Sequence, residues 1–128
     1  MPSRERLQDF IKTVEAGEFV RAIEDFYADD ATMRENSNSP RKTRAALVAH
    51  ERVALTKVRS IKTRPVQRVV VDGDTVVINW VFDITTRDGA MRVLDELAIQ
   101  RWRHDRIVEE QFYYDPAFRT SMNKENRK

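Results

Sequence analysis

Residues 75–114 read TVVINWVFDITTRDGAMRVLDELAIQRWRHDRIVEEQFYY, and this stretch decides the fold because apolar and polar side chains alternate along it. Its β-branched content also favours strands, which are predicted over Thr75 to Arg87, Ala90 to Arg103 and Arg106 to Tyr114. The pair Asp88-Gly89 between the first two is a strong signal for a two-residue hairpin turn. The stretch therefore predicts an antiparallel meander.

The residues before the meander repeat at helical spacing instead. A first amphipathic helix is expected over Arg4 to Ala16, where Gly17 closes it. A second, short helix is expected from Phe19 to Tyr27, and Asp29-Asp30 ends it. Thr43 offers an N-cap for a third helix that runs to about Val58.

Two further strands complete the predicted sheet. Ala31 to Glu35 forms a brief strand, and Lys62 to Asp72 forms one strand that leads through a tight turn into the meander. Helices first and antiparallel strands afterwards are typical of an α+β fold. We expect a single domain over residues 1–118, followed by a polar tail over residues 119–128.

Length and composition restrict the class of protein. The chain has 128 residues, which suits one compact domain, and it has no Cys, which excludes disulfides and thiolate chemistry. Only two His are present, so a three-His zinc site is excluded, and no metal or cofactor is predicted. The charged start and the lack of any long apolar run predict a soluble cytoplasmic protein without a membrane anchor.

Charge argues against a nucleic-acid partner. The 23 Lys and Arg are set against 21 Asp and Glu, so the net charge is only +2. The local basic stretches, which include Arg41, Lys42 and Arg44, lack the interleaved aromatic residues that stack on bases and are expected to lie on the surface. Nucleic-acid binding is therefore not expected.

Several segments resemble the nuclear transport factor 2-like superfamily. Residues 26–35, Phe-Tyr-Ala-Asp-Asp-Ala-Thr-Met-Arg-Glu, resemble the passage from the second helix to the first strand in its members, and Thr43-Arg44 with Leu47 resembles the start of their third helix. Residues 96–102 and 106–116 resemble the closing strands of SnoaL-like, cyclase-type members. The resemblance implies a cone-shaped fold with about three N-terminal helices packed on a curved, mixed, mostly antiparallel sheet.

The superfamily includes ketosteroid isomerases as well as binding domains without activity, so the fold alone does not imply a function. By resemblance, Glu35 falls where the isomerases hold their proton-abstracting Asp. Phe10 and Ala98 fall where they hold the Tyr and the protonated Asp that donate hydrogen bonds to the oxyanion. Neither Phe nor Ala can donate such a bond, so ketosteroid isomerase activity is not expected.

A cavity lining follows from the strand pairing and the resemblance together. A two-residue turn at Asp88-Gly89 sets Asn79 opposite Ala98 and Val81 opposite Glu96, which places a polar face inward. The predicted lining comprises Phe10, Val14, Phe26, Glu35, His50, Asn79, Asp83, Glu96, Ala98, Gln100, Trp102, Glu110, Phe112 and Tyr114.

The same register predicts an apolar outer face made of Ile78, Trp80, Phe82, Leu97 and Ile99. An exposed apolar face of this size marks a partner surface, so a homodimer is expected. If the alternation is reversed, this face is simply core. Both readings stay open at this stage.

Two functions remain open as well. The leading one is a SnoaL-like protein that binds a small, mostly apolar, oxygenated molecule and carries out cofactor-independent isomerisation, cyclisation or hydration. Glu35 or a pair of His50 with a carboxylate would then act as the general base, and a carbonyl or epoxide oxygen of the substrate would be oriented by Tyr114, Gln100 and Asn79. The alternative is a non-catalytic ligand-binding or dimerisation module, in which His50 is a core residue, Glu96 and Gln100 brace the sheet, and Glu51 lies on the surface.

Overall fold

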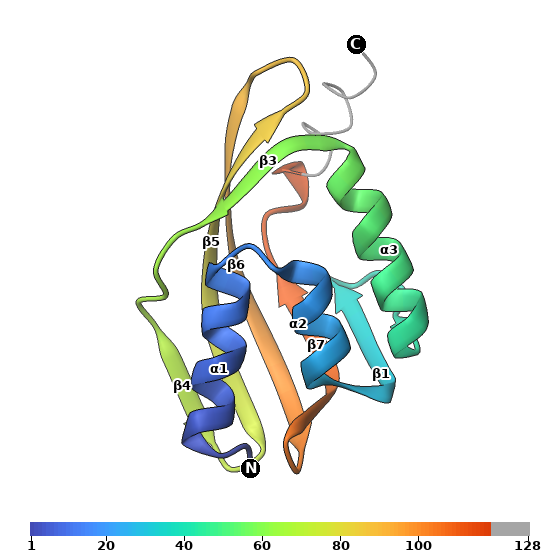
Figure 1. Cartoon of the computed structure of the whole chain (residues 1–128), viewed down its shortest axis with the longest axis vertical. Helices are drawn as coiled ribbons and strands as arrows, with labels where there is room; N and C mark the ends of the chain where they lie inside the picture. Colours follow the sequence, from blue (N-terminus) through green and yellow to red (C-terminus); the bar gives the residue numbers. More distant parts are fainter. Residues whose placement is uncertain (119–128) are drawn as a thin grey trace.

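The computed structural model describes residues 1–118 and shows helices packed against one face of a curved sheet (Figure 1). The predicted polar tail, residues 119–128, lies outside the described residues. The helices are α1 (Arg4–Glu15), α2 (Phe19–Phe26) and α3 (Arg44–Thr56), and the strands are β1 (Tyr27–Glu35), β2 (Arg41–Lys42), β3 (Val58–Thr63), β4 (Val69–Asp72), β5 (Thr75–Thr86), β6 (Met91–Arg103) and β7 (Arg106–Tyr113).

The sheet is mixed but mainly antiparallel. Its strand order is β2-β1-β7-β6-β5-β3, and β4 also pairs with β5. Only the pair β1 and β7 is parallel among the described strands. The predicted α+β architecture is confirmed, with the meander of β5, β6 and β7 at its centre.

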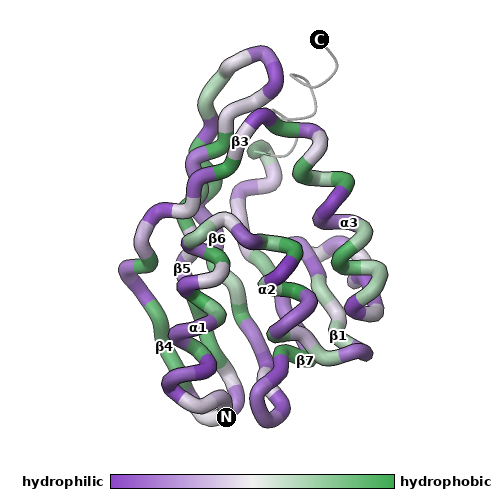
Figure 2. Tube along the Cα trace, in the orientation of Figure 1, coloured by the Kyte–Doolittle hydropathy of each residue, from purple (hydrophilic) through white to green (hydrophobic). Residues whose placement is uncertain are grey.

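The helices begin where the sequence predicts and end one or two residues earlier than predicted. The Ser3 side chain accepts a hydrogen bond from the backbone N–H of Arg6 at the start of α1, and Thr43 accepts one from Ala46 at the start of α3. Gly17 adopts φ +81° just after α1, a conformation that favours glycine. Figure 2 shows hydrophobic and hydrophilic residues alternating along α2, whose apolar side packs inward.

Aromatic side chains join the helices to the sheet. The ring of Phe10 on α1 makes edge-to-face contacts with Phe26, Tyr27, Trp80 and Trp102, at centroid distances of 5.4, 6.3, 6.0 and 5.9 Å. These contacts link α1 to the end of α2 and to strands β1, β5 and β6. Phe10 is therefore the centre of the core.

The first strand is longer than predicted. It begins at Tyr27, directly after α2, instead of at Ala31. The pair Asp29-Asp30 was expected to break the chain, and it lies where the pairing of β1 with β7 shifts register, between Tyr27 and Thr32. The two aspartates thus occupy an irregularity within the strand rather than a break before it.

The predicted single strand from Lys62 to Asp72 is wrong. The structure has two strands there, β3 and β4, and both pair with β5. Pro65 lies in the interruption, where its missing N–H removes a ladder hydrogen bond.

The predicted register between β5 and β6 is wrong by one residue. The backbone N–H of Thr86 donates to the carbonyl of Ala90 at 2.8 Å, so the loop has three residues, 87–89, and not two. Gly89 closes this loop with φ +90°, the left-handed residue that three-residue hairpins use. As a result Ile78 pairs with Ala98 and Trp80 pairs with Glu96.

This shift reverses the faces of β5 but not those of β6. Ile78 and Trp80 are buried and Phe82 is partly buried against the core, so the predicted apolar outer face is wrong for these three. Leu97 and Ile99 on β6 are exposed, as predicted. A one-residue slip moves every side chain of one strand to the opposite face.

No helix in residues 1–118 is long and apolar enough to cross a membrane.

Candidate functional site

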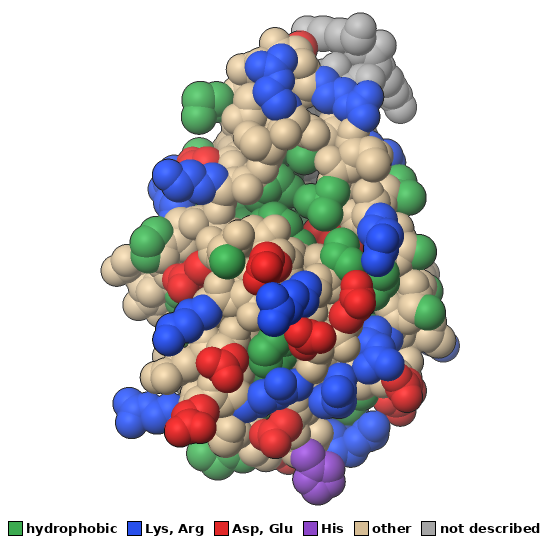
Figure 3. All heavy atoms as spheres, viewed as in Figure 1, with side chains coloured by type: hydrophobic (Ala, Val, Ile, Leu, Met, Phe, Trp, Pro, Cys, Tyr) green, Lys and Arg blue, Asp and Glu red, His purple; other side chains and the backbone are tan. Residues whose placement is uncertain are grey.

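A cavity of about 200 Å³ lies between the helices and the concave face of the sheet. Figure 3 shows hydrophobic side chains gathered around a hollow in the helix-bearing face, whereas mixed charges cover α1 and α2. The apolar lining of the cavity comprises Phe10, Val14, Phe19, Ala22, Ile23, Met33, Ile61, Trp80, Phe82, Ile84, Leu94 and Phe112. The polar lining of the cavity comprises Tyr27, Glu35, Arg41, His50, Glu51, Glu96 and Glu110.

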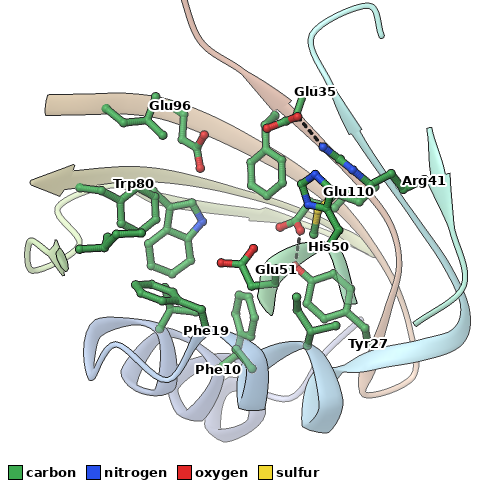
Figure 4. Close-up of a pocket in the computed structure, with 18 of the residues that line it drawn as sticks. Phe10, Phe19, Tyr27, Glu35, Arg41, His50, Glu51, Trp80, Glu96 and Glu110 are labelled. Atoms are coloured by element: carbon green, nitrogen blue, oxygen red, sulfur yellow. Dashed lines mark hydrogen bonds and ion pairs between the residues drawn. The ribbon is translucent and has the colours of Figure 1, made fainter. Parts of the chain in front are cut away.

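Glu110 on β7 is held by a chain of buried hydrogen bonds. Tyr27 donates its hydroxyl to Oε1 of Glu110, and Gln100 donates from Nε2 to Oε2 at 2.6 Å (Figure 4). The indole N–H of Trp102 donates to Oε1 of Gln100 at 3.0 Å. An indole nitrogen can only donate, so Trp102 fixes which end of the Gln100 amide faces Glu110.

These contacts keep Glu110 able to change its charge near neutral pH. Burial raises its pKa to about 7, although the hydrogen bonds from Tyr27 and Gln100 act in the opposite direction. Burial and the nearby Glu110 together raise the pKa of Tyr27 well above its ordinary value. The pair therefore consists of a carboxyl group that can take or release a proton and a phenol that stays neutral.

Glu96 on β6 is the second buried carboxyl group of the cavity. Only 8% of the residue is exposed, and Figure 4 shows its carboxyl group pointing into the cavity. Within residues 1–118 no side chain or backbone group forms a hydrogen bond or ion pair with this carboxyl group. Burial, followed by the proximity of Glu110, Glu35 and Glu51, raises its pKa well above the ordinary value.

The polar end of the cavity is built from β1, β2 and α3. Glu35 and Arg41 form an ion pair with 2.7 Å between Oε2 and Nη2, and both side chains keep some contact with solvent. His50 and Glu51 reach the cavity from α3 (Figure 4). Burial and the charge of Glu35 raise the pKa of Glu51, while Arg41 lowers it.

Seven of the predicted lining residues do line this cavity: Phe10, Val14, Glu35, His50, Glu96, Glu110 and Phe112. Ala98 is fully buried in the core instead. Gln100 and Trp102 lie behind Glu110 and support it instead. Phe26 packs in the core under the guanidinium of Arg6, at 4.1 Å from its ring centre.

Three further predicted lining residues lie away from the cavity. Because of the register shift, Asn79 points to the outer face and donates to Asp95 at 2.7 Å. Asp83 on the same side forms an ion pair with Arg64. Tyr114 follows the end of β7 and packs against Phe118.

Four of the lining residues that sequence reasoning missed carry the polar groups and the indole used below. Tyr27 was assigned to a helix, Arg41 to a basic surface stretch, Glu51 to the surface and Trp80 to the outer face. The position of Glu51 carried a signal, because it lies four residues after the buried Leu47 and so on the same side of α3.

The carboxylates do not form a metal site. Within residues 1–118, no group of three or more His, Asp or Glu side chains is arranged to hold a metal ion. What the arrangement offers is an apolar space with a phenol, a carboxyl group that titrates near neutral pH, and further glutamates.

Comparisons with known proteins agree with this fold. A family described as the SnoaL-like domain matches residues 7–110. No curated protein sequence gives a significant match.

Three solved structures illustrate the likeness in fold. A candidate SnoaL-like polyketide cyclase from Mesorhizobium loti is 25% identical, with a TM-score of 0.73 over 86% of this chain and 97% of the other. A protein of unknown function related to nuclear transport factor 2, from Burkholderia pseudomallei, is 12% identical with a TM-score of 0.80, over 92% and 94%. A protein with a ketosteroid isomerase-like fold from Catenulispora acidiphila, in complex with trimethylamine, is 14% identical with a TM-score of 0.77, over 95% and 94%.

Proposed function

Because this chain belongs to the SnoaL-like domain family, we propose that its cavity binds a small, mostly apolar, oxygenated molecule and that Glu110 and Tyr27 carry out acid-base chemistry on it without a cofactor. The observation that carries this proposal is the buried Tyr27–Glu110 hydrogen bond in the wall of the cavity. Catalytic acids and bases are most effective when their pKa lies near the working pH, and that of Glu110 is about 7.

The size of the cavity limits the ligand. A volume of about 200 Å³ corresponds to roughly seven water molecules at about 30 Å³ each. An engineered apolar cavity of about 150 Å³ binds benzene. The ligand is therefore a molecule with about one ring, such as a cyclic ketone. The phenol of Tyr27 and the carboxyl group of Glu110 suit a carbonyl compound.

The proposed reaction begins with removal of a proton from the carbon beside the carbonyl. The ionised Glu110 takes this proton, and the electrons of the C–H bond move onto the carbonyl oxygen to give an enolate. Glu110 can then donate a hydrogen bond to the oxygen of Tyr27, which frees the phenol hydrogen of Tyr27 to point at the enolate oxygen. In an unsaturated ketone this product is a dienolate, and return of the proton from Glu110 to its far carbon moves the double bond and completes an isomerisation.

This arrangement replaces the donors that Phe10 and Ala98 cannot supply. Tyr27 lies beside the ring of Phe10, with ring centres 6.3 Å apart, so a phenol is available close to that position. Glu35 and His50, the bases proposed from the sequence, line the polar end of the cavity and would orient the substrate there. Tyr114 packs against Phe118 outside the cavity lining, so it is given no role in the reaction.

Hydrogen exchange tests the proposal directly. Cyclohexanone in D₂O should lose its α-hydrogens faster with the protein than in buffer, as followed by proton NMR, and the rate should rise as pH passes about 7, where Glu110 ionises. Glu110→Gln should remove the acceleration. Glu109→Gln, on the neighbouring exposed residue, should keep it. An equal rate in both variants would disprove the role of Glu110.

A non-catalytic ligand-binding module is the alternative that the sequence left open. In that case cyclohexanone would shift the NMR signals of cavity residues without exchanging its hydrogens. The complex of the Catenulispora acidiphila protein with trimethylamine supports small-molecule binding by this fold, although the identity of 14% carries the fold alone.

We also propose that the chain forms a homodimer through its outer sheet face. The supporting observation is a group of exposed apolar side chains on the neighbouring strands β6 and β7. In the observed register this group comprises Val93, Leu97, Ile99 and Tyr113. Contiguous apolar surface of this kind is typical of partner contacts.

A further inference from the structure

The cavity holds more negative groups than its own cations can balance. Its lining includes four glutamates, at positions 35, 51, 96 and 110. Among the described lining residues the basic side chains are Arg41, which already pairs with Glu35, and His50. Three carboxyl groups therefore remain in a largely apolar space, and a buried carboxylate is unfavourable unless it takes a proton or a counter-ion.

Glu96 is a buried carboxyl group that the proposed reaction does not use. It is more than nine-tenths buried, it points into the cavity, and within residues 1–118 its carboxyl oxygens have no hydrogen-bond donor. Glu110, by contrast, accepts from both Tyr27 and Gln100. Such a buried carboxyl group has no hydrogen-bond donor in the described protein. It can therefore bind a ligand that supplies a hydrogen-bond donor or a positive charge.

The apolar walls near Glu96 are aromatic. Trp80 lies directly opposite Glu96 in the strand pairing, and its ring stacks on Phe82 with 6.1 Å between ring centres. Phe82 in turn meets Phe19 from α2. Aromatic rings attract a cation within about 6 Å of the ring centre, and alkylammonium groups in particular, whose apolar methyl groups also pack well against them.

We propose that the ligand of this cavity carries a positive charge, as an alkylammonium group that lies between the carboxyl groups of Glu96 and Glu51 against the ring of Trp80. The proposal rests on the proposed function in one respect, that this cavity is the ligand site. It narrows the substrate class to small oxygenated molecules that also bear an amino group.

Binding of the cation would displace protons from the carboxyl groups of Glu51 and Glu96. Burial raises the pKa of both Glu51 and Glu96, so protons compete with a cation for these groups more strongly than for exposed glutamates. The charged and titratable groups that face Glu96 from the surrounding elements are Tyr27 and Glu35 on β1, Arg41 on β2, His50 and Glu51 on α3, and Glu110 on β7. Most are acidic, so binding of a cation should release protons and should strengthen as pH rises.

A pair of ligands of equal shape separates charge from size. Choline and 3,3-dimethylbutan-1-ol differ in that carbon replaces the quaternary nitrogen, and choline keeps its charge at every pH. Their binding is measured by isothermal titration calorimetry at pH 6 and pH 8.5, in two buffers of different ionisation enthalpy, so that released protons are counted. Glu96→Gln and the matched surface variant Glu109→Gln are measured beside the unmodified protein.

We expect choline to bind at least about tenfold more tightly than the alcohol at pH 8.5, with proton release and a smaller difference at pH 6. Glu96→Gln should remove most of this preference, and Glu109→Gln should keep it. Equal or tighter binding of the alcohol would overturn the inference but leave the proposed ligand site intact. A choline preference unchanged in Glu96→Gln would also overturn it, and failure of both ligands to bind would overturn the ligand site as well.

Discussion

Trp80 on β5 and Glu96 on β6 lie directly opposite each other in the sheet, and both side chains point into the cavity. The indole ring therefore forms part of the apolar surroundings that desolvate the carboxyl group. This pair explains why Glu96 resists ionisation, and the ionisation of Glu96 should therefore affect the stability of the fold.

Glu96→Gln should make the stability of the protein depend less on pH. Because its pKa is raised in the folded state, Glu96 keeps a proton that the unfolded chain has lost, and it contributes stability below the unfolded pKa that disappears as pH rises through the folded pKa. The variant should match the unmodified protein near about pH 4, below the unfolded pKa, and exceed its free energy of unfolding at pH 8 by about 1–3 kcal/mol. Urea denaturation at the two pH values measures this difference.

The matched control is Glu109→Gln. Its carboxylate pairs with Arg101 on the surface, which lowers its pKa, so its loss should not increase stability at pH 8. A Glu96→Gln variant less stable than the unmodified protein at pH 8 would contradict the unpartnered state of this carboxyl group.

Trp102→Phe should raise the pKa of Glu110 above about 7. Without the indole donor, the amide of Gln100 can turn its oxygen toward Glu110, which disfavours the charged carboxylate. NMR titration of carbon-13-labelled glutamate side chains measures the pKa.

Trp80→Phe serves as its control. Trp80 is a core indole of the same size, but within residues 1–118 its N–H makes no hydrogen bond. Both variants should lose about 1–3 kcal/mol of stability from poorer packing. Only Trp102→Phe should shift the pKa of Glu110, and a similar shift in both would mean that burial alone governs this group.

Arg41→Met should raise the pKa of Glu51. The guanidinium of Arg41 lowers this pKa, while burial and the charge of Glu35 raise it, so removal of the cation leaves the opposing effects alone. Arg41→Lys keeps the charge and should change the pKa less, although it weakens the ion pair with Glu35. The same glutamate titration by NMR decides, and an unchanged pKa in Arg41→Met would show that Arg41 does not act on Glu51.

The sequence predicted the three helices and the strands β5, β6 and β7 in the right order because these segments show a clear period. Ser3 and Thr43 cap helices where their side chains suggest, and the alternation along β6 correctly places Glu96, Ala98 and Gln100 inside. These features depend on neighbouring residues within one segment. They can therefore be read without knowledge of the rest of the fold.

The register between β5 and β6 depends on one loop residue and could not be read in the same way. A two-residue and a three-residue turn both suit Asp88-Gly89, and only the pairing of Thr86 with Ala90 distinguishes them. That single residue decides whether Trp80 or Asn79 lines the cavity. Tyr27 was missed for a related reason, since its place on β1 comes from pairing with β7, 80 positions away along the chain at Ile107.

Leu97→Lys should convert a dimer into a monomer if the outer sheet face is the contact. Leu97 and its cross-strand neighbour Tyr113 are 45% and 44% exposed, so the apolar face they share with Val93 and Ile99 is open to a second copy of the chain. A lysine charge in the middle of such a contact would lose its hydration without a partner.

Val53→Lys is the control, because Val53 is also exposed but lies on α3, which packs on the opposite side of the sheet. Light scattering at micromolar concentration should show a dimer for the unmodified protein and for Val53→Lys, and a monomer for Leu97→Lys. A monomeric unmodified protein would refute the homodimer, and a Leu97→Lys protein that remains dimeric would place the contact on another surface.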